Sequence, residues 1–147
     1  MRALIALAAA LALAPVARGA TIHLGWTENY YYHGNVIEHL FVVHVESVTV
    51  GRDSWTVKGS VANTSALRMT IRNRFALVAG SAVFPATRFS PSLPPELAIG
   101  GKWTGSFGGA GKLPRTTTLR VRFGSFKAPL LPGVPGITWL TRHSFRL

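Results

Sequence analysis

The stretch SWTVKGSVA, residues 54–62, decides the fold class of this chain. Apolar or small residues occupy every second position of it, and polar residues occupy the positions between them. The first set is Trp55, Val57, Gly59 and Val61, and the second is Thr56, Lys58 and Ser60. Because successive side chains of a strand point to opposite sides of a sheet, this alternation predicts a strand with one buried and one solvated face.

The same period of two recurs in residues 68–77, 117–124 and 137–147. The side chains expected to be buried in these stretches are Met69, Ile71, Phe75, Leu77, Leu119, Val121, Phe123, Ile137, Trp139, Phe145 and Leu147. Residues 37–50 are apolar more continuously, as in a central strand or in one that bends midway. Four alternating stretches without any helical period indicate half-buried antiparallel strands.

Turn-forming residues separate these stretches. They lie at 51–53, 63–65, 91–95, 108–111 and 129–136. Residues 75–84 and 97–107 add further strand candidates, which makes six to eight strands in all. The sequence therefore predicts an all-β protein, an antiparallel two-sheet sandwich, with irregular backbone at 21–35 and 127–136.

Residues 1–20 have the layout of a secretory signal peptide. Arg2 gives a positive start, residues 3–14 are an unbroken run of Ala, Leu and Ile, and Pro15 ends the run. Small residues precede the expected cleavage site after Gly19. The run is shorter than the roughly 20 residues that a transmembrane helix needs. We expect a signal helix at 1–20, a β-sandwich domain at 21–147, no transmembrane anchor after cleavage, and a secreted or periplasmic protein.

Composition narrows the class of protein further. The chain has no cysteine, which excludes disulfides, thiolate metal sites, a cysteine nucleophile and a lipid-modified cysteine. An exported domain without disulfides favours a bacterial source. The net charge of +11 predicts attraction to polyanions. The alternative is that the arginine content reflects only a GC-rich genome and keeps the domain soluble.

Residues 45–123 carry a series of short β motifs. They are Val57-x-Gly59-x-Val61-x-Asn63-Thr64-Ser65, Leu97-x-x-Gly100 to Gly105-x-Phe107, Leu113-Pro114 and Leu119-x-Val121-x-Phe123. In these motifs the stretch resembles the small immunoglobulin-like domains of secreted bacterial proteins and lipoproteins. The resemblance implies an immunoglobulin-like sandwich, export and no catalytic residue. The chain departs from it by lacking both the lipoprotein cysteine and the disulfide of antibody-type domains.

Groups suited to catalysis are few in the sequence. Asp and Glu number five, no G-x-S-x-G motif is present, and residues 100–112 lack the Gly and Ser/Thr positions of a phosphate-binding loop. Acid–base or nucleophilic catalysis needs paired groups that this spacing does not single out. We therefore expect no enzyme activity and no cofactor.

Metal binding is the alternative function, through His33, His39, His44 and Glu46. Imidazole and carboxylate groups suit zinc or copper. However, His39 would point away from His44 on a regular strand, and no H-x-H or H-x-x-x-H pair exists. Because this ligand spacing is missing, an exposed polar edge of a strand is the favoured explanation of these residues.

Basic residues occupy the solvated side of the predicted strands. The candidate anion-binding residues are Lys58, Arg68, Arg72, Arg74, Arg120 and Arg122. If their strands are neighbours, these side chains form one cationic stripe suited to phosphate or carboxylate. The aromatic residues between them fall on the buried side, which disfavours specific nucleic-acid binding. The sequence thus predicts an exported interaction domain that binds an anionic envelope polymer or a protein partner.

Overall fold

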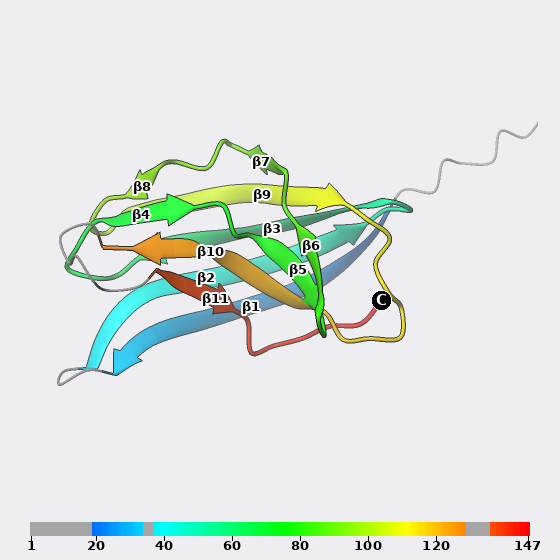
Figure 1. The fold of residues 1–147 in the computed structure, drawn as a ribbon, viewed down its shortest axis with the longest axis horizontal. Coiled ribbons are helices and arrows are strands. Elements are labelled where there is room, and N and C mark those ends of the chain that lie inside the picture. Colours follow the sequence, from blue (N-terminus) through cyan, green and yellow to red (C-terminus); the bar gives the residue numbers. More distant parts are fainter. Residues whose placement is uncertain (1–18, 34–36, 129–135) are drawn as a thin grey trace, which may run out of the picture.

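The computed structural model describes residues 19–33, 37–128 and 136–147, with the backbone alone at 31–33 and 37–39. The described residues form two antiparallel sheets (Figure 1). Sheet 1 has the strand order β1 (Ala20–His33), β2 (Ile37–Val50), β3 (Ser54–Asn63), β9 (Lys102–Ala110) and β7 (Arg88–Ser90). Sheet 2 contains β4 (Met69–Arg72), β5 (Ala76–Ala79), β6 (Ala82–Pro85), β8 (Glu96–Leu97), β10 (Arg120–Lys127) and β11 (Ile137–Leu140).

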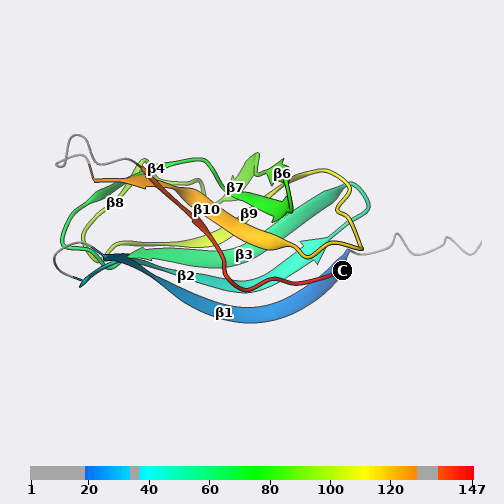
Figure 2. The same ribbon diagram turned by 60° about the horizontal axis from the view of Figure 1, so that its bottom comes forward.

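The two sheets lie face to face, with β4 and β10 in one layer and β1 and β2 in the other (Figure 2). Their inner faces enclose an apolar core rich in aromatic rings. The ring of Phe75 lies 5.0 Å from that of Phe107 and 5.6 Å from that of Phe123, and Phe41 lies 4.5 Å from Phe126. Because each ring removes a large apolar area from water, this core is the main source of stability.

Strand β10 organises sheet 2. Its Arg122 pairs with Ala76 of β5 and with Leu140 of β11, so these two strands lie on opposite edges of β10. Ser125 likewise pairs with Arg72 of β4 and with β11. Strands β4 and β5 therefore follow one another along the same edge of β10, interrupted at residues 73–75.

The predicted all-β, antiparallel two-sheet architecture is confirmed, and so is the alternation of residues 54–62. The exception within that stretch is Ser60, which is buried. None of the described residues forms a helix that could span a membrane. Most of the signal prediction, residues 1–18, lies outside the described residues.

Several expectations about strands were wrong, among them a turn at 108–111, which lies largely within β9, and alternation over the whole of 137–147, where β11 ends at Leu140. Residues 21–35 were expected to be irregular, but Ala20–His33 is a long strand because its backbone pairs with β2 along nearly its whole length. The stretch 68–77 is two strands, and Phe75, Ala76 and Leu77 are buried in succession, which breaks the alternation. Strand β10 continues to Lys127, where irregular backbone was expected.

The described residues form eleven strand segments, more than the expected six to eight. The increase comes from β1, from the division of residues 68–77, and from short edge segments. The edge segment β6 forms a hairpin with β5 across Gly80 and Ser81. Gly80 has φ +60°, a value that glycine adopts without strain, as required at the first turn position of such a two-residue connection.

Candidate anion-binding surface

The outer face of sheet 2 gathers most of the predicted anion-binding residues. Arg120 and Arg122 alternate on β10 with Leu119, Val121 and Phe123, which are completely buried, so the two arginines face solvent. The neighbouring strand β4 ends at Arg72, which is exposed and pairs with Ser125 of β10. The strand pairing thus brings arginines from separate parts of the sequence onto one face.

Two of these arginines are held in place through their Nε atoms. Arg122 Nε donates a hydrogen bond to the backbone oxygen of Arg74 at 2.7 Å, and Arg120 Nε donates one to the backbone oxygen of Thr141. Arg74 belongs to the segment 73–75 that separates β4 from β5. These bonds fix each guanidinium group and leave its terminal nitrogens for a ligand. The planar end of arginine can then bind two oxygens of one anion.

The basic face, defined here as Arg72, Arg74, Arg120, Arg122 and Lys127, includes one residue that sequence reasoning missed. Lys127 is exposed at the end of β10 and pairs with Thr70 of β4. It was overlooked because an irregular segment was expected to begin there. Continuing the alternation of 117–124 by a few residues would not have found it, because the register with β11 shifts between Phe123 and Ser125.

Two predicted members do not join the basic face. Lys58 lies on the outer face of sheet 1, where its Nζ is 3.0 Å from Glu46 Oε1. Arg68 precedes β4 and lies 3.8 Å from Glu96 on the neighbouring edge strand β8. Both ion pairs are exposed to solvent and are therefore weak. Four of the six residues expected in the cationic stripe therefore belong to the basic face, and Lys127 is its fifth member. The four are Arg72, Arg74, Arg120 and Arg122.

The four metal-ligand candidates are not assembled by the described side chains. His44 Nδ1 lies 3.0 Å from the hydroxyl of Thr27, and Glu46 is paired with Lys58. The side chains of His33 and His39 lie outside the described residues. Within the described part of the chain, no group of three or more His, Asp or Glu side chains converges as a metal site would require.

Glu28 is a buried carboxylate that accepts several hydrogen bonds, and the sequence analysis did not single it out. Glu28 is 3% exposed and lies on β1, facing the C-terminal segment. It accepts hydrogen bonds from the backbone nitrogens of Arg142 (2.8 Å) and His143 (3.0 Å), and His143 Nδ1 lies 2.7 Å from it. The alternation of Ile22, Leu24 and Trp26 in the sequence could have predicted this strand.

Burial and hydrogen bonding act in opposite directions on Glu28. Burial raises its pKa, but the hydrogen bonds from the backbone of Arg142 and His143 and from the His143 side chain outweigh this effect. The pKa of Glu28 therefore ends below its ordinary value, and the group is ionised at neutral pH.

The Glu28–His143 pair has the arrangement of a base and its orienting carboxylate. Catalysis would also need a nucleophile next to the histidine. The Thr141 hydroxyl donates to the backbone oxygen of His143 at 2.9 Å, but among the described residues no hydroxyl group is hydrogen-bonded to the His143 ring, which stacks on Trp26 with centroids 5.3 Å apart. The pair therefore serves to fasten the C-terminal segment to β1.

Comparisons with known proteins add no assignment to this site. No match was found. This holds for a scan against protein-family models, for a search of curated proteins and for a search of solved structures. The function must therefore be argued from the chemistry of the surface itself.

Proposed function

We propose that this protein is an exported, non-enzymatic binding domain whose basic face holds an anionic polymer or an acidic protein at the cell envelope. The observation that carries the proposal is the arrangement of five cations, four of them on the neighbouring strands β4 and β10 and the fifth, Arg74, in the segment between β4 and β5. Arg120 and Arg122 are oriented there by bonds to the backbone. The one carboxylate that the described residues place in sheet 2, Glu96, lies at its β8 edge beside Arg68. The face is therefore left with uncompensated positive charge.

The strand order supports an immunoglobulin-like assignment of the sandwich. In immunoglobulin domains one sheet has the order A-B-E-D, and the other contains C, F and G, with C′ beside C in the variable type. Here β2-β3-β9-β7 follows the first order, and β6-β5-β10-β11 follows C′-C-F-G. Strand β1 is then an additional edge strand outside A. Such domains commonly present sheet faces and loops to partners and need no catalytic group.

Export rests on the sequence of residues 1–20. The expected cleavage after Gly19 would leave Ala20, the first residue of β1, at the new N-terminus. The N-terminal sequence of the protein recovered from the periplasm or medium of an expressing bacterium tests this part. Protein that keeps Met1 and stays inside the cell would contradict it.

Chromatography on immobilised heparin, a sulfated polysaccharide, tests the basic face. The double variant Arg72→Gln/Arg74→Gln removes two exposed charges whose side chains have no partner among the described residues. The matched control Arg88→Gln/Lys102→Gln removes two exposed charges from sheet 1. We expect the first variant to elute at clearly lower salt than the control, because binding by a cationic patch depends on its local charge.

The outcome separates a site from a general charge effect. Equal losses in both variants would mean that only the net charge matters, and the proposal would be wrong. Retention that does not change with salt would contradict it as well.

A further inference from the structure

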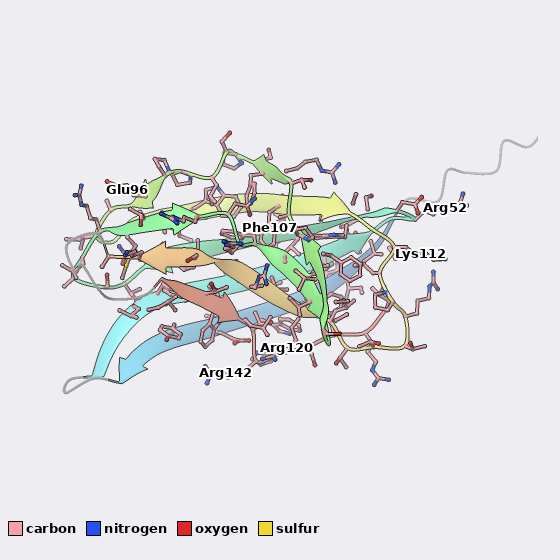
Figure 3. All side chains as sticks on the ribbon, in the orientation of Figure 1. Arg52, Glu96, Phe107, Lys112, Arg120 and Arg142 are labelled. Atoms are coloured by element: carbon pink, nitrogen blue, oxygen red, sulfur yellow. The ribbon has the colours of Figure 1, made fainter. Side chains whose placement is uncertain are left out.

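A cavity of about 660 Å³ lies at the end of the sandwich, away from the basic face. It is formed where the beginning of β1, the β2–β3 turn, the β9–β10 loop and the C-terminal segment meet. Its lining is Gly19, Ala20, Ile22, Val50, Gly51, Arg52, Arg115, Arg146 and Leu147. Figure 3 shows Arg52 and Lys112 together at this end and Glu96 at the opposite end of the molecule. The volume is in the range of about 300–1,000 Å³ that small-molecule sites have.

The floor of this cavity is apolar. Ile22, Val50 and Leu147 are half-buried, and each packs against the hydrophobic core. They come from the beginning of β1, from the end of β2 and from the segment after β11, so the core reaches the surface here. Covering such a floor with an apolar group is favourable, because it removes apolar surface from water.

Three exposed arginines, Arg52, Arg115 and Arg146, line the same cavity. Among the described residues none of them takes part in an ion pair with a carboxylate side chain. The nearest acidic residue in sequence, Asp53, is exposed beside Arg52. An apolar floor with three unpaired guanidinium groups is complementary to an apolar chain with an anionic head.

We propose that this cavity binds a single-chain anionic amphiphile, a fatty-acid carboxylate or an alkyl phosphate. The acyl chain covers Ile22, Val50 and Leu147, and the head group is held by the arginines. This site is separate from the basic face, because its arginines come from turns and from the C-terminal segment, not from the strands of sheet 2. Its ligand differs from a polymer in needing an apolar part.

Titration calorimetry on the purified protein with dodecanoate, dodecyl phosphate, dodecanol and inorganic phosphate, the amphiphiles as monomers, tests the inference. We expect dodecanoate, dodecyl phosphate or both to bind, and the comparison of the two tells which head group is preferred. Dodecanol should bind at least about tenfold more weakly because it lacks the charge, and inorganic phosphate because it lacks the chain. Equal binding of dodecanol and dodecanoate, or absence of heat with both anionic amphiphiles, would overturn the proposal.

Two kinds of variant locate the site. Arg52→Gln/Arg115→Gln/Arg146→Gln should weaken binding of the anionic amphiphiles about tenfold or more, and its three positions are exposed, so the fold should persist. Ile22→Trp should block the cavity. Binding that survives both changes would overturn the proposal. If protein beginning at Ala20 binds and the complete chain does not, the occupant is the chain's own N-terminal segment, and the proposal is equally wrong.

The basic-face variant serves as the matched control. Arg72→Gln/Arg74→Gln should leave amphiphile binding unchanged. When the cavity substitutions are already present, adding Arg72→Gln/Arg74→Gln should still lower heparin retention more than adding Arg88→Gln/Lys102→Gln. The failure of one proposal is therefore distinguishable from the failure of the other.

Discussion

The carboxylate of Glu28 joins the first strand of the sandwich to its last segment. Replacing it by Gln keeps the shape but removes the charge that accepts hydrogen bonds from Arg142 and His143. Because these are bonds to a buried charged group, we expect Glu28→Gln to lower the free energy of unfolding by about 2 kcal/mol. Urea denaturation at neutral pH measures the loss. The matched control is Glu46→Gln, an exposed carboxylate in a surface ion pair, which should cost less than about 1 kcal/mol.

The same carboxylate makes stability depend on pH. The pKa of Glu28 in the folded protein lies below its ordinary value of 4.5, so the unfolded chain takes up the proton first as the pH falls. The contribution of Glu28 is therefore fully present above about pH 4.5 and is lost as the pH falls through the lower folded value. Denaturation curves between neutral pH and about pH 3 should show a steeper loss in the wild type than in Glu28→Gln. Parallel pH profiles would show that the carboxylate is not engaged in solution.

Asn63 fastens the turn after β3 in a comparable way. It is 2% exposed; its Nδ2 donates to the backbone oxygens of Leu67, Leu97 and Ala98, and its Oδ1 accepts from Ser65. Asn63→Ala leaves several buried groups without partners, so we expect a loss of about 3 kcal/mol. The exposed neighbour Thr64→Ala should change the free energy of unfolding by less than about 0.5 kcal/mol. Similar effects of both changes in a thermal or urea melt would contradict this role.

The interactions of Asn63 could be predicted in part from the sequence, whereas those of Glu28 could not. Asn63 stands in an Asn-Thr-Ser turn, and its bond to the backbone of Ser65 is the local contact that such residues favour. Its bonds to Leu97 and Ala98, like those of Glu28 to Arg142 and His143, join positions far apart in the chain. A local pattern contains no signal for such partners.

At the level of strands, alternation predicted best where a strand is continuous and flanked on both sides. Residues 54–62 form β3 between β2 and β9, where the register with β9 is unbroken and the shift in the register with β2 comes from an extra residue of β2, between Val45 and Ser47. Prediction failed where a bulge shifts the register, as in β2 between Val45 and Ser47, because the shift changes the phase of the alternation: Val43 and Val45 face the core before it, and Val48 faces the core after it. It failed again at 73–75, where the interruption of β4 and β5 is set by their pairing with β10.

The approach of β2 and β3 gives a test at the level of strands. Gly59 pairs with Val45 next to the bulge of β2, and a Cβ at this position would collide with the carbonyl oxygen of His44. Gly59→Ala would push the strands apart, and we expect a cost of about 2 kcal/mol. The exposed Thr104→Ala on β9 is the control, with an expected change within about 0.5 kcal/mol. Thermal unfolding of the two variants measures the difference, and a neutral Gly59→Ala would mean that the strands lie farther apart in solution.

Over the whole molecule, charge is distributed unevenly between the two sheets. Sheet 1 presents the exposed cations Lys58, Arg88 and Lys102, of which Lys58 is paired with Glu46, whereas the basic face of sheet 2 carries five cations. The charged residues are known from the sequence, and the alternation predicted that most of them face outward. Which of them share a face could not be predicted, because that depends on strand pairing. The sequence therefore predicted most of the residues of the candidate site, but not which of them lie together on one face.

This asymmetry predicts a conflict between stability and binding. Thr138 is exposed on β11, pairs with Ser125, and lies diagonally across from Lys127. Thr138→Glu places a carboxylate within the basic face and reduces the repulsion among its cations, so we expect a gain of up to about 0.5 kcal/mol at low salt. The same carboxylate should lower retention on heparin, because a cation that attracts it is less available to the polymer. Thr104→Glu changes the net charge equally but lies on sheet 1, and it should lower retention less. If both variants lose retention equally, the protein binds anions through its total charge, and the basic face is not a site.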